Sequence, residues 1–500
     1  MAWIEVNAFS YTYPGGTAPA LNKINLALEQ GAFVVFTGRS GSGKSTLGKA
    51  LAGFLFSDES PNCSGDIIIN GTDMSSIPLY EASKRVAYVQ QNPEDQFCTL
   101  NVEDEIAFGL ENLSVNPIII EQGIDSALST VMGKHLKDRE LSTLSGGEKQ
   151  KIAIASMLAL KPDVLILDEP TSNLDPQATR NIFETLHNLL KLRKMTVIVI
   201  EHKLDQIMDL DPIIFSLDKG KITAGLAPTR KPNHISLPII NSEPSSVLEA
   251  EIPSQPIIQM KNTCIEIGGQ EILHDLDLSI IPGQFIAIMG PNGSGKSTLL
   301  QAIMGFHQVS YGEFMLLDRN ANSVKTSDLV EDLGFVFQNP DHQLFTQSIW
   351  EELTLTVKNL GQLDENTEHA ARHWLEQIDL ADQGKNHPQR LSFGEKKRLN
   401  VAASLLHKPK LLLIDELLIG QDPQNALAWM VFLKSLSELG TTVLLSIHHP
   451  QLVLDYCSRM IFLESGRIAV DEDIPSAFDS LVELGYHSYL PTGKWESYHV

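Results

Sequence analysis

The sequence predicts an α/β protein in which one domain occurs twice, each copy built on a parallel β-sheet. Two glycine-rich loops, one in each half of the 500-residue chain, each follow a short apolar run. A chain of this length also exceeds what one ordinary hydrophobic core supports. Further short apolar runs end beside acidic or histidine residues, at 164–167, 197–200, 411–414 and 443–445. Their shortness favours strands buried on both faces of a parallel sheet over buried helix segments.

Each glycine-rich loop fits the pattern G-x-x-x-x-G-K-[ST] and follows an apolar run, residues 33–36 in the first half and 285–288 in the second. A strand, a glycine loop and a helix in this order form the context in which the pattern binds phosphate, because glycines let backbone N–H groups turn inward around phosphate oxygens. The predicted nucleotide-binding residues are Gly38, Arg39, Ser40, Gly41, Ser42, Gly43, Lys44, Ser45 and Thr46, and Gly290, Pro291, Asn292, Gly293, Ser294, Gly295, Lys296, Ser297 and Thr298.

Within these loops the lysine and the serine that follows it have separate predicted roles. Lys44 and Lys296 are expected to reach the β- and γ-phosphates of a nucleotide, and Ser45 and Ser297 to hold Mg²⁺. One such match could be a mere glycine turn, but two copies, each after a predicted strand, favour the phosphate-binding interpretation.

Acidic pairs stand at the ends of two predicted strands. Asp168 and Asp415 close apolar runs, which would place a carboxylate near Mg²⁺. Glu169 and Glu416 follow directly and are candidates to polarise an attacking water molecule. Such a pair is often only a solvated strand end, but its recurrence at the same offset in both halves favours a catalytic role.

A serine-glycine segment precedes a predicted helix in each half. The segments read Leu144-Ser145-Gly146-Gly147-Glu148 and Leu391-Ser392-Phe393-Gly394-Glu395, and the predicted helices cover residues 149–159 and 396–406. A serine hydroxyl and glycine amides at a helix N-terminus form an anion site, although the same pattern alone could be a capped helix start. The residues predicted to contact nucleotide here are Ser145, Gly146, Gly147, Ser392 and Gly394.

The composition points to a globular protein and argues against a duplex-binding surface, although it leaves room for a local basic patch. The formal net charge of −24 opposes nucleic-acid binding, which requires clustered lysine and arginine. The four cysteines form no C-x-x-C pair, so we expect reduced residues in a cytosolic protein rather than a metal site. We find no signal peptide and no apolar run near the roughly 20 residues that span a bilayer. A role at a membrane would therefore be exercised from the cytoplasmic side, through a partner.

The proline-rich stretch between the halves divides the chain. We predict a first domain at residues 1–227, an extended linker at 228–256, a second domain at 257–485 and a C-terminal tail at 486–500. The tail is expected to be a packed edge or a partner contact rather than a site.

The order of phosphate loop, glutamine, L-S-G-G-E segment, acidic strand end and histidine resembles ABC-type nucleotide-binding domains. The resemblance covers nearly the whole chain except the linker and the last twenty or so residues. It implies two tandem P-loop NTPase domains of ABC type, each with a parallel-sheet core and a helical subdomain. It also implies ATP and Mg²⁺ as ligands, and an ATPase that hydrolyses ATP to drive transport across a membrane.

The resemblance also assigns roles to residues outside the loops. Gln91 and Gln338 match the glutamine that senses Mg²⁺ and touches the membrane partner, and His202 and His448 match the histidine that contacts the γ-phosphate. Asp175 and Asp422 match a residue of the loop that crosses the interface between two such domains. The metal ligands that follow from the motifs and the resemblance are Ser45, Gln91, Asp168, Ser297, Gln338 and Asp415; the catalytic residues are Glu169, His202, Glu416 and His448.

A narrower resemblance concerns the residues after each glutamine. The segments beginning Gln91-Asn92-Pro93 and Gln338-Asn339-Pro340 are similar to the Q-N-P-x-x-Q segment of energy-coupling-factor transporter ATPases, the cobalt and vitamin importers. In that family two ATPases, separate or fused, lie beneath a transmembrane coupling subunit and a membrane-embedded substrate-binding subunit. The resemblance implies uptake of a vitamin, a vitamin precursor or a metal ion, with the chain peripheral on the cytoplasmic face of the membrane.

In the ABC family each ATP lies between the phosphate loop of one domain and the L-S-G-G-E segment of the other. By this pairing, the Lys44 loop faces the segment that carries Phe393 where glycine is usual. The Lys296 loop faces an unaltered segment, but its half lacks a counterpart of Tyr13, which matches the aromatic residue that stacks on adenine. We therefore expect two ATP sites in one chain, both binding ATP and at least one hydrolysing it, with the Lys296 site the faster. The alternative is that the Phe393 side chain points away and the two sites are equal.

Two alternative functions remain open from the sequence. One is the fused ATPase of a sugar importer, against which the Q-N-P-x-x-Q segments argue. The other is a soluble twin-domain ABC ATPase that acts on ribosomes or DNA, which would predict a longer charged linker, basic patches or a cysteine cluster. Co-purification with membrane proteins would separate the importers from the soluble class, and the transported substrate would separate the two importers.

Overall fold

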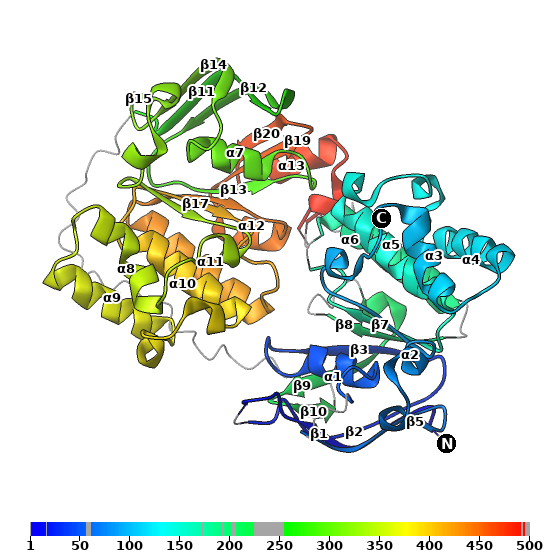
Figure 1. Ribbon diagram of the computed structural model, residues 1–500. Helices are drawn as coiled ribbons and strands as arrows, with labels where there is room; N and C mark the ends of the chain where they lie inside the picture. Colours follow the sequence, from blue (N-terminus) through cyan, green and yellow to red (C-terminus); the bar gives the residue numbers. More distant parts are fainter. Residues whose placement is uncertain are drawn as a thin grey trace. The chain divides into compact units, whose positions relative to one another are not determined.

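The computed structural model describes residues 2–16, 18–56, 62–172, 174–191, 195–201, 207–224, 255–491 and 494–495. The chain divides into two compact units, Met1–Arg230 (unit 1) and Lys231–Val500 (unit 2) (Figure 1). Most of the predicted linker, residues 228–254, lies outside the described residues, so the predicted domain bounds stay a prediction.

Unit 1 contains two sheets. The antiparallel sheet has the order β2-β1-β4-β5 and the larger sheet the order β10-β9-β3-β8-β7-β6, parallel except for β10. The strands are β1 (Ile4–Tyr11), β2 (Leu21–Leu28), β3 (Phe33–Gly38), β4 (Cys63–Ile69), β5 (Thr72–Asp73), β6 (Val86–Val89), β7 (Val164–Asp168), β8 (Thr196–Ile200), β9 (Ile213–Asp218) and β10 (Lys221–Ala224). The helices are α1 (Lys44–Leu51), α2 (Leu79–Ala82), α3 (Val102–Asn112), α4 (Pro117–Thr130), α5 (Gly146–Ala159) and α6 (Pro176–Lys191).

Unit 2 repeats this plan and extends it at the C-terminal end. Its sheets have the orders β12-β11-β14-β15 and β16-β17-β18-β13-β19-β20, the second parallel except for β20. The strands are β11 (Ile258–Ile267), β12 (Gln270–Ile280), β13 (Phe285–Met289), β14 (Val309–Leu316), β15 (Arg319–Asn320), β16 (Leu333–Val336), β17 (Leu411–Asp415), β18 (Thr442–Ser446), β19 (Arg459–Glu464) and β20 (Arg467–Asp473). The helices are α7 (Lys296–Ile303), α8 (Ile349–Asn359), α9 (Glu365–Gln377), α10 (Phe393–Leu405), α11 (Pro423–Glu438), α12 (Pro450–Tyr456) and α13 (Ser476–Glu483).

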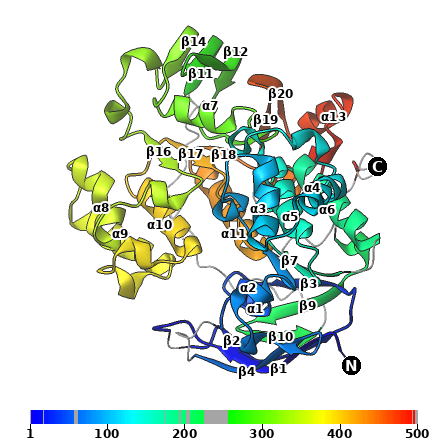
Figure 2. The ribbon, with the colours of Figure 1, turned by 45° about the vertical axis from the view of Figure 1, so that its right-hand side comes forward.

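The parallel strands are buried on both faces and separate two hydrophobic cores in each unit. In β3, Phe33 and Val35 pack with α5 and α6, whereas Val34 and Phe36 pack with α1 and the antiparallel sheet. Unit 2 uses β13 in the same way: α7 lies on one side of the sheet and α11 on the other (Figures 1 and 2). This alternation explains why the strands read as continuous apolar runs in the sequence.

The predicted fold class is confirmed: each unit has a parallel-sheet core and a helical subdomain, α3–α5 in unit 1 and α8–α10 in unit 2. The predicted strands are all present. The helices after the serine-glycine segments begin earlier than predicted, at Gly146 and Phe393, because Ser145 and Ser392 themselves cap them. Within the described part of the tail, Tyr489 and Trp495 are buried in the core of unit 2. Among the described residues, no helix combines the length and apolarity that crossing a membrane requires.

The two units differ in how much room surrounds the last glycine of the serine-glycine segment. A Cβ atom on Gly147 would lie 2.8 Å from the Cβ of Ala178 on α6, whereas a Cβ on Gly394 would have no atom within 4 Å. We expect Gly147→Ala to lower the free energy of unfolding by about 1–3 kcal/mol through overpacking. Gly394→Ala, the matched control, should leave it unchanged or raise it by up to about 1 kcal/mol, because alanine favours the helix.

Urea unfolding without nucleotide measures both variants. Equal effects of the two substitutions would contradict the close contact between α5 and α6.

Candidate functional site

The phosphate loop of each unit joins a central parallel strand to a helix. In unit 1 the loop runs from the end of β3 to Lys44, and Gly43 adopts a left-handed φ of 102° directly before α1. A Cβ on Gly38 would lie 2.2 Å from the carbonyl oxygen of Leu217, so only glycine fits there. The glycines of unit 2 match those of unit 1: Gly38 and Gly290 both have a φ of 141°, and Gly295 has a φ of 101°. The two phosphate loops therefore share one backbone conformation.

Buried polar groups inside both loops fit a phosphate group. The Nζ atom of Lys44 donates to the carbonyl oxygens of Gly38 and Arg39 at 2.9 and 3.0 Å, and Lys296 makes the equivalent contacts in unit 2. The hydroxyls of Ser42 and Ser294 are buried and have no hydrogen-bond partner among the described residues. A buried ammonium and an unsatisfied hydroxyl donor are groups that phosphate oxygens satisfy.

The predicted metal-binding aspartates lie beside the loop serines. In unit 1 the hydroxyl of Ser45 donates to Oδ1 of Asp168 at 3.0 Å. The other carboxylate oxygen accepts a 2.5 Å hydrogen bond from the hydroxyl of Tyr88. Burial raises the pKa of Asp168, although the hydrogen bonds from Tyr88 and Ser45 oppose this rise.

Unit 2 has the same aspartate without the tyrosine contact. Phe335 stands at the position of Tyr88 and has no hydroxyl, and Oδ1 of Asp415 is buried without a hydrogen-bond partner among the described residues. Burial raises the pKa of Asp415, and hydrogen bonding from Ser297 and Ser446 opposes the rise. Hydroxyl and carboxylate oxygens are ligands that Mg²⁺ prefers, and the unsatisfied buried oxygen fits a cation. Ser45 with Asp168, and Ser297 with Asp415, would hold it.

The predicted catalytic glutamates have strained backbones and are held by the predicted glutamines. Glu169 and Glu416 have φ values of 46° and 51°, a region that residues other than glycine rarely adopt. The Nε2 atom of Gln91 donates to Glu169 Oε2 at 2.9 Å, and that of Gln338 donates to Glu416 Oε2 at 2.6 Å. Each glutamine is thus in direct contact with the carboxylate predicted to orient water.

In unit 2 the predicted histidine completes this group. Nε2 of His448 lies 2.9 Å from Oε1 of Glu416. Burial alone would raise the pKa of Glu416, but the hydrogen bond to His448 and the charges of His448 and Lys296 outweigh burial and lower it. The glutamate is therefore kept as an anion, the form that can polarise water. The corresponding residue of unit 1, His202, lies outside the described residues.

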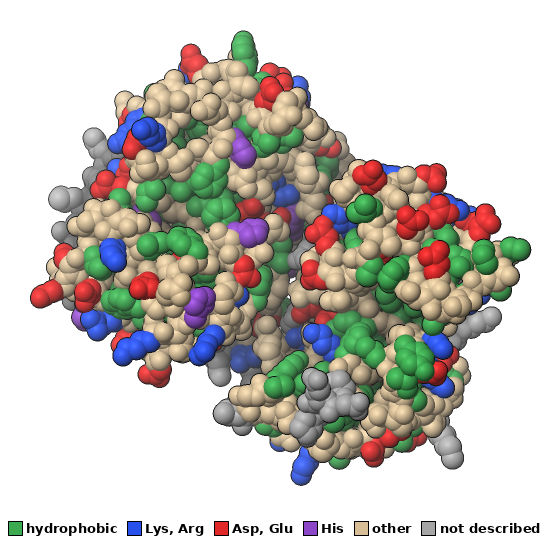
Figure 3. Space-filling model, viewed as in Figure 1, with side chains coloured by type: hydrophobic (Ala, Val, Ile, Leu, Met, Phe, Trp, Pro, Cys, Tyr) green, Lys and Arg blue, Asp and Glu red, His purple; other side chains and the backbone are tan. Residues whose placement is uncertain are grey.

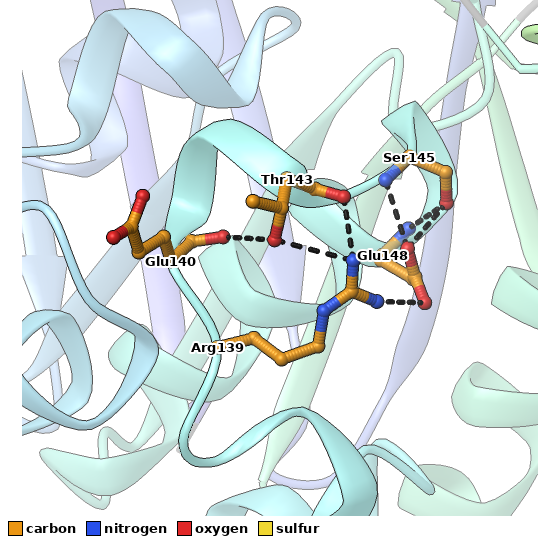
Figure 4. Close-up of polar contacts among 5 residues, drawn as sticks. All are labelled: Arg139, Glu140, Thr143, Ser145 and Glu148. Atoms are coloured by element: carbon orange, nitrogen blue, oxygen red, sulfur yellow. Dashed lines mark hydrogen bonds and ion pairs between the residues drawn. The ribbon is translucent and has the colours of Figure 1, made fainter.

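The serine-glycine segments form capped helix N-termini. Ser145 and Glu148 make a capping box at the start of α5: the Ser145 amide donates to Glu148 Oε2 at 2.8 Å, and the Glu148 amide donates to Ser145 Oγ at 3.4 Å (Figure 4). Arg139 supports the box by bonding both Glu148 and the carbonyl oxygen of Thr143. Ser392 and Glu395 form the same box in unit 2. Each cap leaves a positively polarised helix end at the predicted anion position.

Phe393 fits the backbone of its helix without strain. It is the first residue of α10 and does not have a positive φ, so the helix start itself does not require glycine. Its side chain is 47% exposed, and its ring lies over the Nζ atom of Lys397 at 4.9 Å. Any need for glycine here must come from the approach of a nucleotide, not from the fold.

The remaining predicted residues lie near these groups. Tyr13 is 45% exposed, and its hydroxyl lies 3.1 Å from Oγ1 of Thr46, which places the ring beside the phosphate loop. Asp175 accepts from the Ala178 amide at the start of α6, and Asp422 caps α11 through the amides of Gln424 and Asn425. Both aspartates therefore fix the turn between the catalytic glutamate and the next helix.

Sequence reasoning missed three groups that bear on the site. Tyr88 contacts the metal-binding aspartate, and Lys397 contacts the turn after Glu416. In unit 1, the hydroxyl of Thr171 donates to the buried carboxylate of Glu201 at 2.6 Å. A comparison of the two halves position by position would have found these residues, because each differs in chemistry from its counterpart.

Comparison with known proteins bears on this arrangement directly. The model of the ABC transporter family matches residues 21–172 and 273–418, which contain both phosphate loops, both serine-glycine segments and both acidic strand ends. The chain belongs to the ABC transporter family. As an ABC ATPase it binds ATP and couples ATP hydrolysis to transport.

Several relatives of this ABC ATPase are similar over nearly their whole length. A putative ABC transporter ATP-binding protein of Methanosarcina mazei is 33% identical over 98% of the chain and 92% of that protein. The putative HMP/thiamine import ATP-binding protein YkoD of Bacillus subtilis is 33% identical over 94% of the chain and 91% of that protein. Among solved structures, CbiO1 of Clostridium perfringens, described as part of the ABC transporter complex cbiONQ, is 30% identical with a TM-score of 0.40, covering 44% of the chain and 87% of CbiO1.

The contact between Tyr88 and Asp168 yields a testable difference between the units. Groups that hydrogen-bond a metal ligand orient it, and their loss weakens metal binding by about tenfold to a hundredfold. In a Glu416→Gln background, where only unit 1 retains its catalytic glutamate, we expect Tyr88→Phe to raise the Mg²⁺ concentration for half-maximal ATP hydrolysis by about tenfold.

The matched variant is Phe335→Tyr in a Glu169→Gln background, which should lower the Mg²⁺ requirement. An unchanged requirement in Tyr88→Phe would show that the hydroxyl does not orient Asp168.

Proposed function

We propose that this ABC ATPase drives an importer of the energy-coupling-factor type, from the cytoplasmic face of the membrane and beneath a transmembrane coupling subunit and a substrate-binding membrane subunit. The observation that carries the proposal is the Q-N-P-x-x-Q segment present after both glutamines, at residues 91–96 and 338–343. The name of the YkoD relative, an HMP/thiamine import protein, supports a vitamin or vitamin precursor as substrate over a metal ion.

The last glutamine of each segment ties the segment to the sheet and to the signature helix, the name used here for α5 and α10. In unit 1, Gln96 accepts from the Gln90 amide after β6 and donates to the carbonyl oxygen of Ala153 on α5. In unit 2, Gln343 accepts from the Phe337 amide and donates to Ser404 on α10. These contacts support a role for the segment in passing movement of the signature helix to a partner.

Ion pairs strengthen the same connection. Lys149 at the start of α5 pairs with Glu94 of the segment, and Lys396 of α10 pairs with Asp341 at 2.6 Å. Lys396 is largely buried and also donates to Gln389, so its ion pair is better protected from solvent than a surface pair. Each signature helix is therefore joined to its Q-N-P-x-x-Q segment by a charge pair and by a glutamine.

The loop after each segment presents an apolar side chain on a fixed backbone. Leu100 is 81% exposed and Phe345 is 72% exposed. A buried glutamate anchors each loop: Glu105 Oε2 accepts from the amides of Cys98 and Thr99, and Glu352 makes the equivalent contacts. An apolar group held in a preformed loop loses little conformational entropy on docking, which supports this loop as a contact for the membrane subunit.

A further exposed apolar surface lies at α2. Leu79 and Tyr80 of α2 are exposed, and hydrophobic side chains are visible over α2 in Figure 3. Acidic side chains gather instead over α3–α6 of unit 1 (Figure 3). That acidic face is unsuited to nucleic acid, which supports a membrane-protein partner over ribosomes or DNA.

We further propose that the chain forms two composite ATP sites, as in its family. One would combine Lys44, Asp168 and Glu169 with Ser392, and the other would combine Lys296, Asp415 and Glu416 with Ser145. The capped N-termini of α5 and α10 support this pairing, because a helix N-terminus presents backbone amides that favour an anion, although each serine hydroxyl already donates to the glutamate of its own cap.

The residues then act by positioning and charge stabilisation. The loop amides and Lys44 or Lys296 bind the phosphates, and Glu169 or Glu416 orients and polarises the water that attacks the γ-phosphate. Mg²⁺, when bound, neutralises charge on the phosphates. Gln91 and Gln338 contact the glutamates directly, so a movement of either catalytic glutamate would move the first residue of a Q-N-P-x-x-Q segment.

The two composite sites should differ in rate. The Lys296 site pairs with the unaltered Ser145-Gly146-Gly147 segment, whereas the Lys44 site pairs with the segment that carries Phe393, whose side chain would crowd the phosphates. We expect Glu416→Gln to reduce ATP hydrolysis by the assembled transporter more than Glu169→Gln does. Steady-state ATPase rates measure the difference, and a greater loss from Glu169→Gln would reverse the assignment.

The apolar loops test the proposed membrane partner. We expect Leu100→Asp combined with Phe345→Asp to abolish co-purification with membrane subunits and substrate uptake, because the charges would be buried at the contact. ATP hydrolysis by the isolated chain should stay within about twofold, since neither side chain contacts the predicted nucleotide residues.

Leu439→Asp serves as the matched control, because Leu439 is also an exposed leucine but lies at the end of α11. Uptake of labelled HMP, thiamine, cobalt and maltose into cells that carry the transporter distinguishes the substrate classes. Uptake of maltose alone would overturn the proposal. So would co-purification of the double variant with the same membrane proteins as the unmodified chain.

A further inference from the structure

Lys397 is an unusual residue at the centre of unit 2. It lies on α10 five positions after Ser392, its side chain is only 1% exposed, and it is among the largest fully buried side chains of the described residues. Its Nζ atom donates to the carbonyl oxygens of Leu417 and Ile419 at 2.8 and 2.9 Å, and to that of Glu416 at 3.5 Å. A lysine ammonium has three donors, so these carbonyl oxygens match its full capacity.

The three carbonyl oxygens belong to the turn that carries the catalytic glutamate, defined here as the catalytic turn (residues 416–419). The Glu416 backbone is left-handed, a conformation that persists only where its surroundings enforce it. The ammonium sits inside the turn and bonds it at its first, second and last residues. The bonds to Leu417 and Ile419 have the length of charge-assisted hydrogen bonds, whereas the contact with Glu416 is longer and weaker.

Unit 1 holds its equivalent turn in another way. There the hydroxyl of Thr171 donates to the buried Glu201. The counterparts of these residues in unit 2, Leu418 and Ile447, have no polar side-chain atoms, so the same bond is impossible there. Lys397 supplies the missing restraint from the other side, from the signature helix.

The counterpart of Lys397 in unit 1 makes no such contact. Gln150 is 2% exposed, and its Nε2 atom has no hydrogen-bond partner among the described residues. It lines a small cavity of about 100 Å³ together with Gly146, Pro170 and Leu174. The longer lysine side chain of unit 2 reaches the turn instead.

Lys397 also contacts the start of its own helix. The ring of Phe393 lies over the Nζ atom at 4.9 Å, within the range of a cation–π interaction. One ammonium therefore contacts the catalytic turn and the side chain that follows Ser392. We define Ser392 and Phe393 as the signature start.

We propose that Lys397 is a positioning residue that joins the signature start to the catalytic turn, so that the two ATP sites of the chain respond to each other. The inference rests on the proposed composite sites, in which the signature start serves the Lys44 site and the catalytic turn serves the Lys296 site. A nucleotide that engages Ser392 would then bias the position of Glu416 through one buried side chain. In unit 1 the Nε2 atom of Gln150 has no hydrogen-bond partner among the described residues, so it does not hold the equivalent turn as Lys397 does.

A double-mutant cycle tests this connection in the full chain. In a Glu169→Gln background only the Lys296 site hydrolyses ATP, while Ser392→Ala disturbs the other site. We expect Ser392→Ala to change the hydrolysis rate at the Lys296 site by about threefold or more. The ratio of the rates without and with Ser392→Ala should return to one when Lys397→Met is also present. Lys397→Arg, which retains charged donors, should preserve the ratio.

Controls separate this effect from a loss of structure. Lys434→Gln removes an exposed lysine that lies over the Tyr456 ring of the same unit, and it should leave the ratio unchanged. If Lys397→Met does not fold, as judged by thermal unfolding, Lys397→Gln replaces it, because glutamine is the residue that unit 1 carries at this position.

The outcomes distinguish the two levels of the argument. If Ser145→Ala leaves hydrolysis at the Lys296 site intact, the proposed composite sites are wrong and the role of Lys397 falls with them. If Ser145→Ala abolishes hydrolysis but the ratio from Ser392→Ala is the same with and without Lys397, the composite sites stand and the role of Lys397 is refuted.

Discussion

The hydrogen bond between Ser45 and Asp168 shows the constraint on which each unit depends. Strand β8 lies between β3 and β7, and all three run parallel, so the phosphate loop at the end of β3 and the carboxylate at the end of β7 meet at one edge of the sheet. Parallel sheets bind ligands at this edge, beyond the carboxyl ends of their strands. The buried alternating side chains of β3 fix the strand in place, and the loop glycines then let the helix begin directly over the site.

On this common frame the two units diverge in the contacts that surround the catalytic groups. Tyr88 satisfies one oxygen of Asp168, whereas the matching aspartate of unit 2 retains an unsatisfied oxygen. The turn after the catalytic glutamate is restrained by Thr171 and a buried glutamate in unit 1, and by Lys397 in unit 2. Burial lowers the pKa of Lys397 to about 7, even though the nearby charge of Glu416 opposes this fall. A buried ammonium is retained at such a cost only where its hydrogen bonds are satisfied, which fits its three carbonyl partners.

The duplicated motifs were sufficient to predict the fold class and the central strands of the parallel sheets, because phosphate binding requires fixed residues at fixed spacing, but the antiparallel sheets were not predicted. The start of the signature helices was predicted three residues late at Gly146, and likewise at Phe393, because a serine cap extends a helix beyond its apolar pattern. Tyr88 and Lys397 could not be assigned from motifs, since each acts across a long separation in the chain through a hydrogen bond that spacing does not encode. The roles of His202 and of the linker stay predictions.

The central claim is that one chain forms two ATP sites that bind nucleotide and differ in chemistry. Rapid-quench measurement of a single turnover tests it most directly, with ATP supplied at two equivalents per full chain in the assembled transporter. The account predicts that both equivalents are hydrolysed in two phases of equal amplitude with distinct rate constants. Hydrolysis of both equivalents in one phase would contradict the inequality of the sites, and hydrolysis of one equivalent alone would contradict the presence of two active sites.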